Sequence, residues 1–241
     1  MEKYSMKLSQ RLIHVADFLP KGAYFADIGS DHAYLPCYIC LRDRAAKAIA
    51  GEVNQGPYES AKKNVRKYGL ENRVDVRLGD GLDVLQHEEV NQLVIAGMGG
   101  ALIASILEKG KEKLTNVKQI IAQPNIDARQ VRLWFKNNNF ILTDERILDE
   151  KGHIYEILVA DRDSNSPYTA EITERQLLFG PYLLENKNDV FYKKWYDEEE
   201  KLTAIIKQVK RATDPDEEKI RQFTKERAWI KEELATNEDS N

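Results

Sequence analysis

Short apolar segments that alternate with helical patterns are the feature that most constrains the fold of this 241-residue chain. The apolar segments are residues 23–28, 46–50, 74–78, 92–96 and 118–122, and a loop and a helical stretch follow each of them. Strands that alternate with helices form βαβ units, so we expect a mostly parallel sheet covered by helices. Two further segments, 141–148 and 154–160, flank Asp149-Glu150-Lys151-Gly152, which predicts a hairpin at an antiparallel edge of the sheet.

Helices are expected before and after these strands in the sequence. Residues 4–19 carry apolar residues at helical spacing, and residues 161–167 are the clearest linker in the chain. Two apolar stripes then follow: Phe191, Trp195, Leu202, Ile205 and Val209, and after them Ile220, Phe223, Ile230 and Leu234. Asp214 and Pro215 lie between the stripes and suit the N-cap and first position of a second helix. We therefore predict a Rossmann-like α/β domain over 1–163 and a helical, coiled-coil-like hairpin over 164–241.

Composition limits the classes of function. The net charge of −4 argues weakly against a nucleic-acid partner, but residues 1–163 hold 23 basic and 23 acidic residues, so the acidity belongs to the C-terminal segment. There is no apolar run long enough to cross a membrane and no secretory pattern near Met1. The two cysteines, Cys37 and Cys40, lie in an apolar helical stretch and are interpreted as buried residues that pack in the core. We expect a cytoplasmic protein without a metal site.

The segment Asp27-Ile28-Gly29-Ser30-Asp31 ends the first strand, the place where α/β sheets bind ligands. A dinucleotide fingerprint would require glycine at the position of Asp31, where the pyrophosphate approaches the backbone. A carboxylate there repels phosphate and attracts a sulfonium or an α-amino group, so the site favours a cationic amino-acid ligand. Asp31 can instead be a helix N-cap, and His32 an ordinary first-turn residue; both interpretations stay open.

Further candidates lie at the ends of the second and third strands. Glu52, 25 positions after Asp27, is placed to accept the hydroxyl groups of a ribose, with Val53 beside it. Asp80 and Gly81 end the third strand, where an acid and a glycine can hold the edge of an adenine, although Gly-Asp-Gly is also ordinary turn chemistry.

The fourth strand is followed by Ala96-Gly97-Met98-Gly99-Gly100. Methyltransferases of exocyclic amines usually carry an Asn/Asp-Pro-Pro-aromatic motif here, and this chain lacks it. Glycines let the backbone approach the ligand, which suits a nucleophile with a free lone pair such as a ring nitrogen. Gly100 can simply ease the strand into the next helix.

Gln123 and Asn125 follow the fifth strand and could each bond to a nucleobase edge, although Pro-Asn is also common loop chemistry. Basic residues form four clusters in the sequence. We interpret each cluster as the solvent-exposed face of a helix, and the alternative is that it contacts the phosphates of a nucleic acid. The clusters are Arg42, Arg44 and Lys47; Lys62, Lys63, Arg66 and Lys67; Arg129, Arg132 and Lys136; and Lys193 and Lys194 beside Trp195, which we expect to pack.

These motifs resemble the bacterial tRNA (adenine-22-N1)-methyltransferase family, TrmK. The resemblance rests on Asp-Ile-Gly-Ser-Asp-His-Ala-Tyr-Leu-Pro from Asp27, Ala-Gly-Glu-Val-x-x-Gly-Pro from Ala50, Arg-Leu-Gly-Asp-Gly-Leu from Arg77, Ala-Gly-Met-Gly-Gly from Ala96 and Gln-Pro-Asn from Gln123. It implies a class I S-adenosylmethionine methyltransferase sheet with a C-terminal α-helical domain. The implied reaction is methyl transfer to N1 of an adenine in the D-arm of tRNA, which must be unpaired or flipped out to react.

The residues and the resemblance together give a set of expected roles. The residues expected to bind the cofactor are Asp27, Gly29, Ser30, Asp31, Glu52, Val53, Asp80, Gly81, Gly97 and Met98. The residues expected to position the target adenine are His32, Gln123 and Asn125. The expected partner is tRNA, with no membrane, metal or stable protein partner. Three alternatives remain: a methyltransferase of small molecules or proteins, a non-catalytic RNA-binding protein that retains the fold, and, disfavoured by Asp31, a nicotinamide oxidoreductase.

Overall fold

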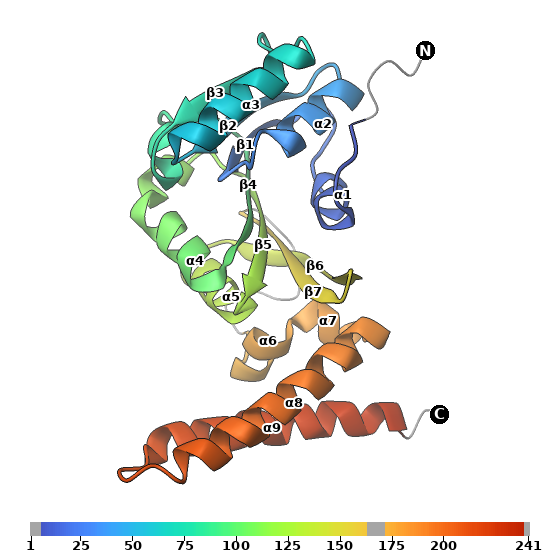
Figure 1. Cartoon of the computed structure of the whole chain (residues 1–241), viewed down its shortest axis with the longest axis vertical. Helices are drawn as coiled ribbons and strands as arrows, with labels where there is room; N and C mark the ends of the chain where they lie inside the picture. The colour runs from blue at the N-terminus through green and yellow to red at the C-terminus, as the bar shows by residue number, and fades with distance from the viewer. Residues whose placement is uncertain (1–5, 163–171, 239–241) are drawn as a thin grey trace. The chain divides into compact units, whose positions relative to one another are not determined.

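A seven-stranded sheet with the order β3-β2-β1-β4-β5-β7-β6 forms the centre of the structure (Figure 1). The computed structural model describes residues 6–162 and 172–238. The strands are β1 Tyr24–Ile28, β2 Lys47–Glu52, β3 Val74–Leu78, β4 Gln92–Gly99, β5 Gln119–Ile126, β6 Ile141–Glu150 and β7 His153–Asp161. β1 to β5 pair in parallel, whereas β7 pairs antiparallel with β5 and with β6. The predicted parallel sheet with an antiparallel hairpin edge is confirmed.

Helices cover both faces of this sheet (Figure 1). They are α1 Gln10–Ala16, α2 Tyr34–Arg42, α3 Gln55–Lys67, α4 Gly100–Lys109, α5 Ala128–Asn137 and α6 Glu174–Phe179, with the short 3-10 helices η1 Gly81–Val84 and η2 Lys111–Leu114. Alternate residues of a strand point to opposite faces. Phe25 of β1 accordingly joins a core cluster with residues of α1, α2 and α3, while Ile28 joins a second cluster with residues of α4 and α5.

The helix α1 and the strands β4 and β5 differ most from their predicted bounds. α1 covers only part of residues 4–19, because the Ser9 hydroxyl caps its start by accepting the Leu12 N–H. β4 and β5 continue past their apolar segments, and Met98 pairs with Pro124 across a register shift after Ala96. The glycine-rich segment and Gln123 therefore lie inside strand ends instead of after them.

The turn between β6 and β7 has the chemistry that the sequence predicts. Lys151 and Gly152 both have positive φ, at 56° and 85°, as a two-residue hairpin turn with right-handed strand twist requires. The Asp149 carboxylate accepts the Gly152 N–H at 2.8 Å and fixes this turn.

Contacts divide the chain into two compact units, Met1–Tyr182 and Leu183–Asn241. The second unit holds α8 Asp189–Val209 and α9 Glu217–Glu238, while α7 Pro181–Glu185 spans the division. α8 and α9 pack against each other, with Arg227 bonded to Glu199 at 2.7 Å, which confirms the helical C-terminal part. The predicted boundary between residues 163 and 164, and most of the predicted linker, lie outside the described residues, so that division stays a prediction.

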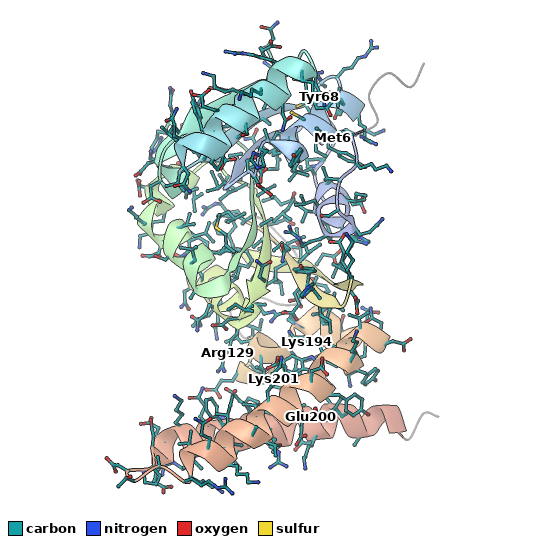
Figure 2. All side chains as sticks on the ribbon, in the orientation of Figure 1. Met6, Tyr68, Arg129, Lys194, Glu200 and Lys201 are labelled. Atoms are coloured by element: carbon teal, nitrogen blue, oxygen red, sulfur yellow. The ribbon has the colours of Figure 1, made fainter. Side chains whose placement is uncertain are left out.

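Two side-chain expectations for the second unit have clear outcomes. Trp195 is buried, as expected, and Lys194, labelled in Figure 2, lies with its ammonium 4.6 Å from the centre of the Trp195 ring. The N-cap of α9 was expected at Asp214, but Asp216 occupies the cap, accepting the Lys219 N–H at 2.9 Å.

Across the residues described, none of the helices combines the length and apolar character needed to cross a membrane.

Candidate active site

The strand order brings most of the candidate residues together at one end of the sheet. β1 lies between β2 and β4, so the chain leaves β1 toward one side of the sheet and returns through β4 on the other. Ligands of α/β sheets bind at the carboxyl ends of the strands at such a switch point. The ends of β1, β2, β4 and β5 carry most of the predicted site residues, and the sheet brings these together.

Asp27 is the buried acid at the end of β1, with 4 % of its surface exposed. The Ser30 hydroxyl donates to its Oδ2 at 2.6 Å, and Oδ1 has no hydrogen-bond partner among the described residues. Burial raises the pKa of Asp27 to about 7, against the lowering effects of the Ser30 hydrogen bond and of the charge on Arg11. A buried carboxyl held this close to neutral pH is suited to a cationic ligand, which would favour its charged form.

The turn after β1 is held in an uncommon backbone conformation. Gly29, Asp31, His32 and Ala33 all have positive φ, and non-glycine residues adopt it at an energetic cost. A β-carbon on Gly29 would overlap the Met98 methyl group, so the two strand ends approach as closely as glycine allows. The N-cap of α2 is Ala33, not Asp31, and Asp31 remains exposed. The capping interpretation of Asp31 is therefore wrong.

Glu52 ends β2 and is almost fully buried. Its Oε1 accepts the backbone N–H of His32 at 3.0 Å, which joins the ends of β1 and β2, while Oε2 has no partner among the described residues. Burial raises the pKa of Glu52, and the His32 hydrogen bond opposes that shift. Val53, the next residue, has 59 % of its surface exposed. A free carboxylate oxygen beside an exposed apolar side chain matches the predicted ribose site.

His32 follows Asp31 in the turn after β1, and its side chain is about one-third exposed. Its Nε2 lies 3.4 Å from Asp31 Oδ1, and its buried Nδ1 has no hydrogen-bond partner in the described structure. Asn64 of α3 donates to the His32 carbonyl at 2.9 Å and so fixes its backbone. The ring is therefore held partly buried beside Asp31, with its Nδ1 enclosed by protein.

Asp80 and Gly81 are more open to solvent than the other candidates. The Asp80 side chain is 64 % exposed and pairs with Lys109 of α4 at 2.8 Å. Gly81 begins η1 with φ of +54°, as the turn interpretation of Gly-Asp-Gly expects. The geometry is compatible with both interpretations, and their cofactor role stays a prediction.

Gln123 organises the ends of β4 and β5 from a fully buried position. Its Oε1 accepts from the Gly97 N–H at 3.0 Å and from the Arg11 guanidinium, and its Nε2 donates to the Pro124 carbonyl at 2.9 Å. Asn125 donates to the Gly97 carbonyl at 2.8 Å and is exposed. Direct contact between Gln123 and a nucleobase edge was expected. Its amide is instead buried and engaged at both ends, so the structure speaks against that contact.

Arg11 is the site residue that the sequence did not single out. It extends from α1 to Gln123, 112 positions later in the chain, and its guanidinium lies 5.3 Å from the centre of the Tyr155 ring. The only signal in the sequence is a basic residue in an amphipathic helix, a pattern common to solvated helices. Only the tertiary packing of α1 places this charge beside the switch point.

Several other candidates have structural roles. Arg132, expected on a solvated helix face, is fully buried and bonds Glu145 at 2.6 Å and Glu156 at 3.4 Å, so that interpretation is wrong. A β-carbon on Gly100 would collide with the Asp127 carbonyl, so this glycine allows close packing. Cys37 and Cys40 are buried free thiols, with pKa values that burial raises to about 12 and about 11. The described residues hold no cluster of three or more side chains that could bind a metal.

Comparisons with known proteins show the family to which the chain belongs. The family profile of tRNA (adenine(22)-N(1))-methyltransferases, TrmK, matches residues 25–239. The tRNA (adenine(22)-N(1))-methyltransferase of Bacillus subtilis is 48 % identical over 215 residues, which cover 89 % of this chain and 90 % of the relative.

Solved structures are similar over almost the whole chain. The crystal structure of the B. subtilis m1A22 tRNA methyltransferase TrmK has a TM-score of 0.89 and 45 % identity, covering 95 % of this chain and 100 % of that one. The Streptococcus pneumoniae protein Sp1610 in complex with S-adenosyl-L-methionine has a TM-score of 0.84 and 40 % identity, with the same coverage of both chains. This chain belongs to the tRNA (adenine(22)-N(1))-methyltransferase family.

Proposed function

We propose that this protein transfers the methyl group of S-adenosylmethionine to N1 of adenine 22 in tRNA. The observation that carries the proposal is that two buried acids, Asp27 and Glu52, lie close to the Gly97 backbone at the end of β4, at one switch point of the sheet. The names of the relatives supply the substrate, and the missing Asn/Asp-Pro-Pro-aromatic motif agrees with a ring nitrogen as the methyl acceptor.

The residues at the switch point fit the cofactor. Asp27 has a free carboxylate oxygen and a raised pKa, which suits the α-ammonium group, and Glu52 has a free oxygen for the ribose hydroxyls. Gly29 and Gly97 adopt positive φ, the backbone conformation that glycine takes most easily, and so shape the strand ends around the cofactor. Ser30, Asp31, Val53, Asp80, Gly81 and Met98 complete the proposed cofactor-binding set.

S-adenosylmethionine, when bound, supplies a methyl group activated by its attachment to a positively charged sulfur. The protein's part is to align that group with adenine N1, which is unprotonated at neutral pH and needs no general base. His32 and Asn125 lie next to these strand ends and position the adenine, whereas Gln123 holds the backbone of Gly97 in place. Favourable electrostatics at the cationic product, from acids such as Asp31 at the same turn, assist the reaction.

The partner is tRNA, and the compartment that we propose is the cytoplasm, in keeping with tRNA as substrate and with two reduced cysteines. The exposed basic residues Lys63, Arg66 and Lys67 of α3 are available for phosphate contact in the first unit. How the two units share the RNA is a separate question that binding experiments address.

The test is methyl transfer from labelled S-adenosylmethionine to unmodified tRNA transcripts that carry adenine or guanine at position 22. We expect label on the adenine transcript alone, and none with Asp27→Asn. Asp75→Asn, a substitution of an exposed acid on β3, is the matched control and is expected to keep full activity. Equal labelling of both transcripts would overturn the site. Cofactor binding without labelling of any tRNA would indicate a small-molecule or protein substrate.

A further inference from the structure

Exposed apolar side chains form a row along the carboxyl ends of the five parallel strands. Each strand contributes one large hydrophobic residue that is exposed, either at its own end or in the first turn of the helix that follows. In the order of the strands in the sheet they are Leu78, Val53, Tyr34, Leu102 and Ile126. A single exposed apolar residue is ordinary, whereas a row of them at a ligand-binding edge indicates contact with a ligand.

The proposed cofactor accounts for only one half of this row. Glu52 and Asp80, which are proposed to hold the nucleoside of the cofactor, lie at the ends of β2 and β3. Leu102 and Ile126 follow β4 and end β5, on the other side of β1. The methyl acceptor has to approach from the side that the nucleoside leaves free. These two side chains are therefore placed to meet the RNA.

Ile126 is the most exposed of these side chains, and its backbone is fixed on both sides. It pairs with Gly99 of β4, and its Cγ1 would lie 3.7 Å from a β-carbon on that glycine. The next residue, Asp127, has a φ of +55°, and its carbonyl packs against Gly100. Even so, 72 % of the Ile126 surface is exposed. A side chain on such a fixed backbone loses little entropy when a partner packs on it.

The chemistry of the reaction identifies that partner. N1 lies on the pairing edge of adenine, so the target must turn out of the base stack to react. Its departure leaves an apolar gap between the neighbouring bases, and proteins that unstack bases often fill such gaps with isoleucine or leucine. We propose that Ile126, with Leu102 of the adjoining helix α4, packs against the bases next to adenine 22 and fills this gap. The inference rests on the proposed function.

The adenine itself is the competing partner for Ile126. Successive residues of a strand point to opposite faces, and Asn125 and Ile126 are the last two residues of β5. The Asn125 amide faces the Gly97 carbonyl, at the strand ends where the adenine is proposed to lie. Ile126 therefore points away from that position, which favours contact with the neighbouring bases.

The experiment uses full-length protein and a tRNA transcript with 2-aminopurine in place of adenine 22, because this base fluoresces strongly only when it is unstacked. Ile126→Ala is expected to reduce the fluorescence of the saturated complex and to lower kcat on the adenine transcript about 5- to 30-fold, the effect of losing one buried aliphatic contact. The dissociation constant for tRNA should change less than about threefold, since phosphate contacts supply most of the affinity. S-adenosylhomocysteine binding and the melting temperature should not change, because the side chain is exposed.

Three further variants separate apolar packing from other effects. Ile126→Leu should keep most of the activity, whereas Ile126→Asn, which is similar in size but polar, should behave like Ile126→Ala. Leu133→Ala is the matched control, since Leu133 is also exposed but lies in the middle of α5, and it should match wild type in every measurement.

The other outcomes contradict gap filling in distinguishable ways. Weaker tRNA binding with unchanged fluorescence at saturation would make Ile126 an ordinary docking contact. Weaker S-adenosylhomocysteine binding would assign it to the cofactor. Full activity of Ile126→Ala and Ile126→Asn beside an active wild type would refute this inference and leave the proposed function intact. Wild-type protein that binds S-adenosylhomocysteine but methylates no tRNA would overturn the proposed function, and this inference with it.

Discussion

Asp27 is the residue whose charge depends most on what occupies the site. Its pKa is about 7 in the folded protein because the carboxyl is buried, against an ordinary value of 3.8. Below pH 7 the free protein therefore holds a proton on Asp27 that a bound ammonium group would displace. The cofactor and the proton compete for one carboxyl.

We predict that S-adenosylhomocysteine affinity rises with pH up to about 7 and then levels off. Binding at pH 6 should release a proton, because the ligand's positive charge lowers the Asp27 pKa, and binding at pH 8 should release none. Calorimetry at pH 6 in buffers of different ionisation enthalpy measures this proton directly. Asp27→Asn should bind weakly and without pH dependence; proton release that persists in this variant would assign the titration to another group.

Single residues were predictable where their role follows from position in the chain. Asp27 and Glu52 follow apolar strands, and parallel strands bring their carboxyl ends to one edge. Arg11 and the burial of Gln123 were not predictable, because they depend on contacts between residues more than 100 positions apart. The left-handed backbone at Ala33 was also hidden, since alanine does not favour that conformation by itself.

At the scale of elements, Arg132 is the residue that ties helices to the hairpin edge. It projects from α5, bonds Glu145 on β6 and Glu156 on β7, and donates to the carbonyls of Leu177 and Leu178 in α6. All three charged side chains are buried, so their mutual attraction replaces the water they have lost.

We predict that Arg132→Met lowers the free energy of unfolding by about 3–5 kcal/mol, because two buried carboxyls lose their cation. Burial already raises the pKa of Glu145 to about 7, so without Arg132 this carboxyl should take up a proton and make the loss larger at high pH. Urea unfolding at pH 6 and pH 8 measures both effects. Gln130→Met, on an exposed position of the same helix, is the control. A loss of similar size in that variant would point to the methionine itself.

The start of α4 offers a second prediction at this scale. A β-carbon on Gly100 would collide with the Asp127 carbonyl, whereas one on the neighbouring Gly99 would make ordinary contact with Ile126 at 3.7 Å. We expect Gly100→Ala to cost about 1–3 kcal/mol of stability, the range for overpacking, and Gly99→Ala to cost much less. Thermal unfolding of the two variants compares them, and equal melting temperatures would contradict the close packing of α4 on the loop before α5.

Element type was easier to predict than element bounds. Short apolar runs identified all five parallel strands and the hairpin, because strands covered by helices on both faces are apolar along most of their length. They missed the ends of β4 and β5, where Gly97 and Pro124 continue the strands without an apolar pattern. The N-cap of α9 fell on Asp216 because Asp214 and Asp216 both suit a cap, and sequence preference alone does not choose between them.

For the whole molecule, the division into two units predicts separable properties. Every proposed cofactor residue lies in the unit Met1–Tyr182, whereas the unit Leu183–Asn241 carries 12 basic and 15 acidic residues. The two units therefore differ in chemistry as well as in architecture.

We predict that protein truncated after Tyr182 binds S-adenosylhomocysteine with an affinity within about threefold of full length, since all the proposed ligand contacts remain. Calorimetry on the truncated and full-length proteins provides the comparison, with circular dichroism to show that the truncated chain is folded. A folded truncation that no longer binds would place part of the cofactor site in residues 183–241. Comparison of tRNA affinity in the same two proteins then measures the contribution of the helical unit to RNA binding.

The link between Arg11 and Gln123 also has a consequence for the protein during its own synthesis. A ribosome adds roughly 5–20 residues per second, so α1 emerges several seconds before the strand that carries its partner. When Asp27 and Glu52 have been synthesised, the growing chain still lacks β4 and β5. β4 must insert beside β1, and β5 carries Gln123, the partner of Arg11. The proposed cofactor site is thus completed only when the last parallel strands fold, so we expect that an unfinished nascent chain does not bind the methyl donor there.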